Sequence, residues 1–289
     1  MARPRSSPAA REQAVEDPSR REFFGRLAAT LTTSAGSMGA LALSLGADEA
    51  QAAPPAPPAW GTPSSTPLEI DLPQLQYPGR WEPRPGVMRE VGVELRLRTR
   101  LEPKREPSVV SPEDAALFDT PFLYVAGQGG LPELGEVADA RLRRFLDLGG
   151  LIVFDDADGG SDYRFREDVS ALVGRLVPGA ALAEIAPEHV LYRSFYLIDA
   201  PAGRTRNAES NLGVVQEGRI KILYLPNDLG GALSRDAQGR YIHACSPGGA
   251  VQREWARRLA VNILLYATCT DYKSDRAHVE TLLRRRRWR

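Results

Sequence analysis

Two hydrophobic periods alternate along the middle of the chain and predict a fold of alternating strands and helices. Continuous apolar runs at 121–127, 151–154 and 219–226 are typical of strands buried on both faces of a sheet. Residues 137–149 and 162–177 instead place their apolar side chains at helical spacing. Strands and helices that alternate over short loops predict a mostly parallel sheet covered on both faces, an α/β three-layer sandwich.

Three further segments extend this pattern. Residues 89–100 alternate apolar and polar side chains, which predicts a half-buried strand at the start of the folded domain. Residues 212–218 are expected to pair with the strand at 219–226 through a turn at Gly218. Residues 251–268 predict a helix, and its four charged side chains exclude a membrane span.

Composition restricts the class of protein. The 289 residues are 43% hydrophobic and carry 37 basic and 37 acidic side chains, which excludes a wholly disordered chain and gives no reason to expect a nucleic-acid partner. The charges are unevenly placed, because residues 53–270 hold 24 basic and 28 acidic side chains whereas residues 271–289 hold seven and three. An acidic domain with a basic tail is therefore expected.

The first fifty residues predict export. The stretch "SRREFFGRL" resembles the twin-arginine signal, with Arg20, Arg21 and Phe23 at its matching positions. An uncharged, mildly apolar segment follows at 27–47, and "AQA" supplies a cleavage site after Ala52. The resemblance implies recognition by the twin-arginine translocase, which carries folded cargo, and a periplasmic or cell-envelope location. An uncleaved anchor remains an alternative.

Four regions follow from these patterns. Residues 1–52 are the signal peptide, and residues 53–86 form a linker that begins with six prolines in fifteen residues. The α/β domain is expected at 87–270, and a basic tail at 271–289. The tail "LLRRRRWR" either contacts an anionic surface or is a frayed, solvated terminus.

A series of short motifs resembles a known family. They are "FLYVAGQGG", "LRRFLDLGGLIVFDDADGG", "PEHVLYRSFY", "GRIKILYLPNDLG" and "LAVNILLYA". In this order they resemble family 4159 of bacterial domains of unknown function, whose fold is similar to the flavodoxin-like sandwich of class I glutamine amidotransferases. The resemblance covers roughly residues 91–270 and implies a fold but no activity.

The amidotransferase nucleophile has no counterpart here. In that fold a cysteine stands at the end of the strand that corresponds to 151–154, and this chain has Asp155 or Asp156 there. Cys245 and Cys269 lie elsewhere, so amidotransferase activity is not expected. Whether the two cysteines form a disulfide or remain separate thiols is open.

The acidic stretch "DDADGG" has three interpretations. In the first, its carboxylates lie in a solvated turn and cap the helix that begins near Asp162. In the second, the stretch belongs to a ligand or metal pocket at the carboxyl ends of the strands, where a hard divalent cation could bind. In the third it resembles the haloacid-dehalogenase phosphatase signature, which makes Asp156 the nucleophile, Asp158 the general acid and Lys221 the phosphate-binding lysine.

Other polar residues follow the predicted strands. His189 is a candidate acid or base, and Asp156, His189 and Asp228 are expected to converge if a pocket exists. The full set of candidate ligand-binding residues is Gly127, Gln128, Gly129, Asp155, Asp156, His189, Asn227 and Asp228.

Two hypotheses of function remain. The favoured one is an exported, non-catalytic module of the cell envelope that binds a ligand or an envelope protein and needs no cofactor. The alternative is a hydrolase or phosphatase that uses Asp156 and Asp158 with a divalent metal.

Overall fold

The computed structural model describes the backbone of residues 69–199 and 201–286 and the side chains as far as Thr268. These residues belong to one compact unit, Thr62–Arg289. The predicted export signal around Arg20 and Arg21, the cleavage site after Ala52 and the proline-rich part of the linker lie outside the described residues.

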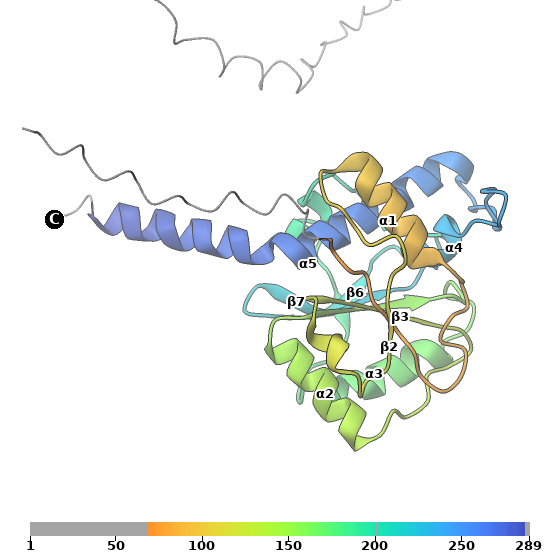
Figure 1. The fold of residues 1–289 in the computed structure, drawn as a ribbon, viewed down its shortest axis with the longest axis horizontal. Helices are drawn as coiled ribbons and strands as arrows, with labels where there is room; N and C mark the ends of the chain where they lie inside the picture. The colour runs from red at the N-terminus through yellow and green to blue at the C-terminus, as the bar shows by residue number, and fades with distance from the viewer. Residues whose placement is uncertain (1–68, 200, 287–289) are drawn as a thin grey trace, which may run out of the picture. The chain divides into compact units, whose positions relative to one another are not determined.

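A seven-stranded sheet forms the centre of the domain, in the order β2-β1-β3-β4-β7-β6-β5 (Figure 1). The pairs β2-β1, β1-β3, β3-β4 and β4-β7 are parallel, and β6 pairs antiparallel with both β7 and β5. The predicted hairpin of β6 and β7 is confirmed. The strands are β1 Gln74–Leu75, β2 Val109–Val110, β3 Phe122–Gly127, β4 Leu151–Asp156, β5 Ala183–Glu184, β6 Leu212–Gln216 and β7 Arg219–Leu225.

Helices cover both faces of the sheet, which confirms the predicted three-layer α/β sandwich. Helices α2 and α3 lie on one face, and α1, α4 and α5 lie on the other (Figure 1). The helices are α1 Val87–Arg98, α2 Glu136–Asp147, α3 Arg164–Leu176, α4 Leu229–Leu233 and α5 Gly249–Arg286, with 3-10 turns η1 Ala115–Phe118 and η2 Val190–Arg193. None of the helices in the described part of the chain is long and apolar enough to cross a membrane.

The central strands are apolar on both faces because each face has its own core. Along β3, Leu123 and Val125 belong to the core under α2 and α3, whereas Tyr124 and Ala126 belong to the core under α1 and α5. Successive side chains of a strand point to opposite faces. The continuous apolar runs in the sequence are the consequence.

The prediction of a strand at 89–100 is wrong, because this segment lies in α1. Val87, Val91 and Leu95 are four residues apart and are all buried, whereas Leu97 is 75% exposed. The valines and leucines of this segment fit a period of two and a helical stripe equally well. The described contacts favour the helix, since α1 covers the end of the sheet where β1 and β3 pair.

The folded domain begins before the predicted boundary at residue 87. Strand β1 pairs with both β2 and β3, and Leu72 and Leu75 are buried. Residues 69–86 therefore belong to the domain rather than to the linker. At the other end, the backbone of α5 continues as a helix to Arg286, through the predicted start of the tail at residue 271.

The strand order places a switch point at the carboxyl edge of the sheet. From β1 the chain crosses to β2 through α1 on one face, and from β3 it crosses to β4 through α2 on the other face. The order of strands thus reverses between β1 and β3. In open α/β sheets, ligands bind outside the carboxyl ends of the strands at such a switch point.

Candidate ligand-binding site

The two aspartates that end β4 are buried and point to opposite faces of the sheet. Asp155 accepts a hydrogen bond from the hydroxyl of Tyr124 at 2.6 Å, and Asp156 accepts one from the hydroxyl of Tyr224 at 2.8 Å. Each aspartate is 1% exposed. The interpretation of a solvated turn that caps α3 is therefore wrong for these two residues.

Asp155 is a cap for a different helix. Its carboxylate accepts hydrogen bonds from the backbone N–H groups of Leu229 at 2.8 Å and Gly230 at 2.6 Å, in the first turn of α4. A carboxylate at this position satisfies N–H groups that have no partner inside the helix. Asp155 thus joins β4 to the segment that follows β7.

Burial favours the protonated forms of both aspartates. It raises the pKa of Asp156 to about 6, against the hydrogen bond from Tyr224. Burial and then the negative charge of Asp228 raise the pKa of Asp155 to about 7. Both directions follow from the cost of placing a carboxylate in a medium of low polarity.

The contacts of Asp158 give no support to the phosphatase interpretation. Asp158 accepts a hydrogen bond from Gly129 N at 2.6 Å, and its own N–H donates to Asp156 at 3.0 Å. The carboxylate of Asp158 is thus used to hold the glycine-rich loop after β3. Lys221 lies 4.0 Å from Asp147, which ends α2 next to the amino end of β4, far from a phosphate at its carboxyl end.

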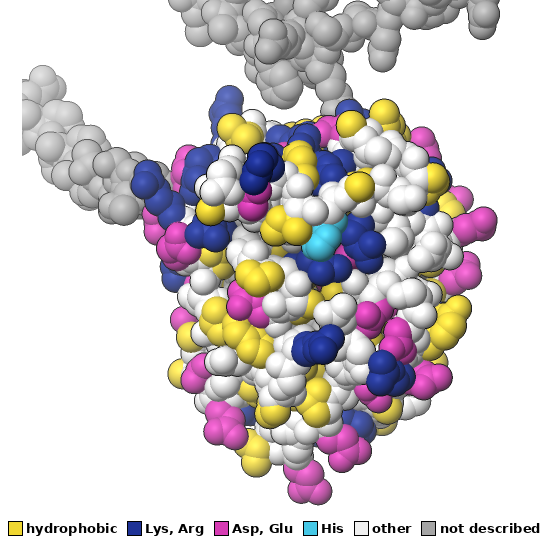
Figure 2. Space-filling model, turned by 90° about the vertical axis from the view of Figure 1, so that its right-hand side faces the viewer, with side chains coloured by type: hydrophobic (Ala, Val, Ile, Leu, Met, Phe, Trp, Pro, Cys, Tyr) yellow, Lys and Arg dark blue, Asp and Glu magenta, His cyan; other side chains and the backbone are white. Residues whose placement is uncertain are grey.

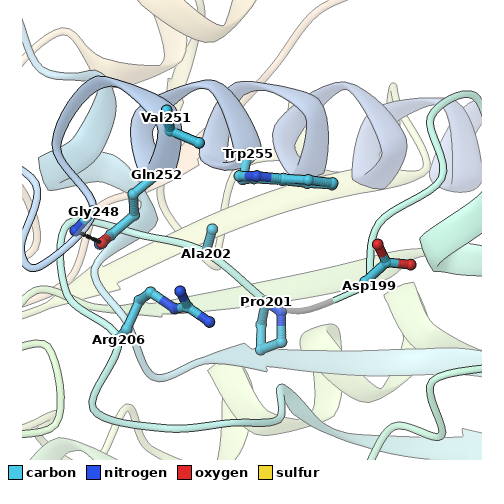
Figure 3. A pocket seen from close by; sticks show the side chains of 8 residues that line it. All are labelled: Asp199, Pro201, Ala202, Arg206, Gly248, Val251, Gln252 and Trp255. Carbon is cyan, nitrogen blue, oxygen red and sulfur yellow. Dashed lines mark hydrogen bonds between the residues drawn. The ribbon is translucent and has the colours of Figure 1, made fainter. Parts of the chain in front are cut away.

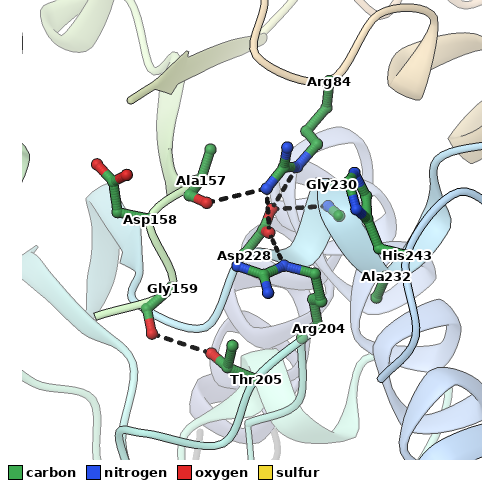
Figure 4. A network of polar contacts seen from close by, with 12 residues as sticks. Arg84, Ala157, Asp158, Gly159, Arg204, Thr205, Asp228, Gly230, Ala232 and His243 are labelled. Atoms are coloured by element: carbon green, nitrogen blue, oxygen red, sulfur yellow. Dashed lines mark hydrogen bonds and ion pairs between the residues drawn. The ribbon is translucent and has the colours of Figure 1, made fainter. Parts of the chain in front are cut away.

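Asp228 lies at the centre of a network that the sequence did not reveal (Figure 4). It is fully buried and binds two guanidinium groups, those of Arg84 and Arg204. Arg84 Nη2 lies 2.6 Å from Asp228 Oδ2 and also donates to the carbonyl of Ala157 at 2.9 Å. Burial opposes the charge of Arg84, but the contact with Asp228 outweighs it and raises the pKa of Arg84.

The backbone of Asp228 is unusual for a residue that has a side chain. Its φ of 54° lies in the left-handed region, which asparagine and aspartate tolerate better than other non-glycine residues. In this conformation its side chain accepts the N–H of Gly231 at 2.7 Å and caps α4. The predicted candidate Asp228 is thus well placed, and its role is to hold the two arginines.

His243 faces the same network. Burial and the positive charge of Arg84 lower the pKa of His243, and Arg204 and Arg253 act in the same direction. Arg253 donates to the carbonyl of His243 at 2.6 Å and fixes this loop. A space-filling view shows a histidine with basic side chains beside it on this side of the molecule (Figure 2). The site is therefore a concentration of positive charge.

Close backbone contact holds the loop that carries Arg204. A Cβ atom on Gly203 would lie 2.0 Å from the carbonyl oxygen of Asn227, so no larger residue fits there. Arg204 N and Thr205 N donate to the carbonyls of Asp228 and Asn227. The side chain of Asn227 bonds the backbone of Ala208 at both its oxygen and its nitrogen. The predicted ligand residue Asn227 thus supports the loop.

A cavity lies at the carboxyl edge of the sheet, beside the loop after β3. This open cavity of about 430 Å³ is lined by the predicted residues Gln128 and Gly129 and by Arg80 and Arg164. Gly127 ends β3 and pairs with β4, and its carbonyl accepts a hydrogen bond from Ala157 N. Arg80, which lines the cavity, and Arg84 both follow β1, at the switch point of the sheet.

His189 does not join this site, so the expected convergence with Asp156 and Asp228 is wrong. Its ring packs against Tyr266 at 5.6 Å and lies by the backbone of Gly218, which precedes β7. Asp228 follows β7, at the other end of the strand. Burial lowers the pKa of His189, and its Nδ1 accepts a hydrogen bond from Leu191 N as a cap of η2.

Metal ligands are not gathered in the described residues, where no three His, Cys, Asp or Glu side chains could hold one ion. Cys245 is buried with a free thiol, and Cys269 lies beyond the described side chains. The cationic groups at this edge of the sheet are guanidinium groups, those of Arg80, Arg84, Arg164 and Arg204. Such groups suit a carboxylate, sulfate or phosphate ligand.

Sequence reasoning missed Arg84, Arg204 and His243. Each lies in a loop with several glycines or prolines, outside any periodic segment, and they are separated by 120 and 39 positions. Arg84 lies in the segment that the sequence assigned to the linker. No local motif links the three residues, because the sheet alone brings them together.

The comparison with protein families identifies one match. The family described as "Domain of unknown function (DUF4159)" matches residues 71–268. The matched region contains all of β1 to β7 and every residue of the network around Asp228. No curated protein matches the chain.

Proposed function

The chain belongs to the DUF4159 family of domains of unknown function, and we propose that it is an exported binding module of the cell envelope whose crevice holds an anionic ligand. One observation carries the proposed binding: two guanidinium groups, from Arg84 and Arg204, share the single buried carboxylate of Asp228. The three groups together have one positive charge in excess. The raised pKa of Asp155 favours its neutral form, so Asp155 offsets little of this excess charge below about pH 7.

The location supports the same ligand class. Both arginines lie at the carboxyl edge of the parallel strands, where ligands bind in open α/β sheets. Arg204 keeps 27% of its side chain exposed and so can contact a molecule in solvent. Guanidinium groups bind carboxylate, sulfate and phosphate with two parallel hydrogen bonds.

A binding module is favoured over a hydrolase by the state of the acidic residues. The oxygens of Asp155 and Asp156 accept hydrogen bonds from tyrosines and from backbone N–H groups. A nucleophile needs a free oxygen that can reach the substrate. Export is supported by the twin-arginine motif at Arg20 and Arg21.

Calorimetric titration of the full chain with sulfate tests the proposed binding. We expect sulfate to bind the unmodified protein and to bind Arg204→Gln about tenfold to a hundredfold more weakly, since one charged hydrogen-bonding group is lost. Arg240→Gln is the matched control, because Arg240 pairs with Asp236 at 2.9 Å and its side chain is 76% exposed. No heat from sulfate, phosphate or citrate, or equal affinities in Arg204→Gln and the unmodified protein, would reject the proposal.

A further inference from the structure

A separate pocket lies between the start of α5 and the segment from Asp199 to Arg206 (Figure 3). Its volume is about 310 Å³, at the lower end of the range for small-molecule sites. None of the residues that the sequence singled out as ligand-binding candidates lines it. The pocket therefore calls for its own explanation.

One wall of the pocket is apolar and aromatic. The indole ring of Trp255 is seen edge-on on the α5 side, and Pro201 lies across from it (Figure 3). Val251, one turn earlier in α5, lines the same wall and is 70% exposed. Arg258, which pairs with Glu254 at 3.0 Å, lies 5.3 Å from the centre of the indole ring and helps to hold its orientation.

The rim of the pocket carries one positive and one negative side chain. Arg206 and Asp199 stand at opposite ends of it (Figure 3). Both are exposed, and neither makes an ion pair within the described part of the chain. Gln252 is already engaged, since its amide donates to the carbonyls of Gly203 and Arg204 and fixes the loop.

We propose that this pocket binds one ring of a neutral saccharide. A pyranose ring has a face of C–H groups that packs against an aromatic plane such as Trp255, and its hydroxyls both donate and accept hydrogen bonds. Arg206 can only donate and a carboxylate such as Asp199 only accepts, so together they suit hydroxyls on opposite sides of one ring. The two charges cancel, which favours a neutral ligand over an anion or a cation.

Titration calorimetry of the full chain with cellotriose, maltotriose and tri-N-acetylchitotriose tests this proposal. We expect at least one of these neutral trisaccharides to bind, and Trp255→Ala and Arg206→Ala each to weaken it about tenfold or more. Tyr163→Ala is the matched control for the aromatic residue, because Tyr163 is 64% exposed outside the pocket. Arg240→Ala is the control for the charged residue.

Three results would overturn the proposal. The first is that none of the three sugars gives heat, and the second is that both pocket variants bind the sugar as tightly as the unmodified protein. The third is that glucose 6-phosphate binds whereas no neutral sugar does. If Trp255→Ala does not fold, as judged by circular dichroism, Arg206→Ala decides, because this side chain is exposed. The anion proposed for Arg84 and Arg204 binds elsewhere, so either proposal can fail alone.

Discussion

At the scale of single residues, the central feature is one buried carboxylate shared by two guanidinium groups. Asp228 compensates one of the charges of Arg84 and Arg204, and the other is left in excess near His243. Placing unpaired charge in a partly buried site is costly. An external anion removes that cost, so the affinity for the anion must depend on the protonation of nearby groups.

This linkage predicts that sulfate binds more tightly as the pH falls from 8 to 5. Burial and Arg84 lower the pKa of His243, so the side chain is neutral at pH 8. A bound anion stabilises the protonated form and raises that pKa, and by linkage protonation of His243 strengthens the binding of the anion. Titration calorimetry at several pH values measures the effect, and sulfate has the advantage that it does not itself titrate in this range.

The control for this prediction is His243→Asn, in which the dependence on pH should be smaller. It should not vanish, because Asp155 lies close to Asp228 and also takes up a proton near pH 7. An equal slope in the variant and the unmodified protein would contradict the role of His243.

A second prediction concerns stability and Asp156. Burial raises the pKa of Asp156 to about 6 in the folded protein, against an ordinary value near 4 when the chain is unfolded. The folded state then holds the proton more tightly, so this contribution is fully present below pH 4 and is lost as the pH rises through 6. Its loss should lower the free energy of unfolding by about 2 kcal/mol between pH 4 and pH 7.

Asp156→Asn should remove this part of the pH dependence. The amide can still accept the N–H of Asp158 and can donate to the hydroxyl of Tyr224. Urea unfolding at pH 4, 5.5 and 7 measures the difference between the variant and the unmodified protein. Asp147→Asn, on an exposed helix end, should keep the original slope. The same slope in Asp156→Asn would show that Asp156 is not the group that titrates.

At the scale of elements, the buried strands could be predicted and α1 could not. Apolar runs such as 151–154 have no polar face, and in a chain of this length they fit only the centre of a covered sheet. In α1, Val91, Val93, Leu95 and Leu97 satisfied a strand period as well as a helical one. The choice depends on residues of other segments, such as Leu72 and Tyr124, which share a core with the buried side chains of α1.

The loop that carries Arg204 is the element whose position matters most for the site. Gly203→Ala should weaken sulfate binding and lower stability, because a Cβ atom there would lie 2.0 Å from the carbonyl oxygen of Asn227. Relief of this overlap moves Arg204 away from Asp228. We expect a loss of about 1 to 3 kcal/mol in the free energy of unfolding, as for other overpacked sites.

Thermal unfolding and sulfate titration check this prediction together. The matched control is Gly174→Ala, since Gly174 lies inside α3 and a Cβ atom there meets nothing within 4 Å. Alanine favours helix over glycine by roughly 1 kcal/mol, so this control should be slightly more stable and bind sulfate normally. Unchanged binding in Gly203→Ala would mean that the loop does not position Arg204.

At the scale of the whole molecule, strand order decides what the sequence could reveal about the site. Asp155, Asp228 and Gln128 follow apolar runs, so their place at the carboxyl edge of a parallel sheet was predictable. Arg84 was not, because β1 is only two residues long and gives no periodic signal. The pairing of β1 beside β3 brings Arg84 to Asp228, 144 positions away.

The same long-range pairing gives a physical reason for the predicted route of export. Parallel strands that are far apart in sequence pair slowly and expose apolar segments while they fold. A route that carries folded cargo avoids refolding such a sheet outside the cytoplasm. We therefore expect Arg20→Lys combined with Arg21→Lys to keep the protein in the cytoplasm, folded and at full length, in a bacterial host with a twin-arginine translocase.

Cell fractionation with mass spectrometry measures this outcome. The unmodified chain should be recovered from the envelope or periplasm beginning at Ala53, as the cleavage site after Ala52 predicts. Arg3→Lys combined with Arg5→Lys is the control, since these arginines precede the motif and should not affect export. Export of the Arg20 and Arg21 double variant at the normal level would exclude the twin-arginine route. Because the sulfate titrations use purified protein, that result would leave the binding proposal standing and would change only the place where the ligand is met.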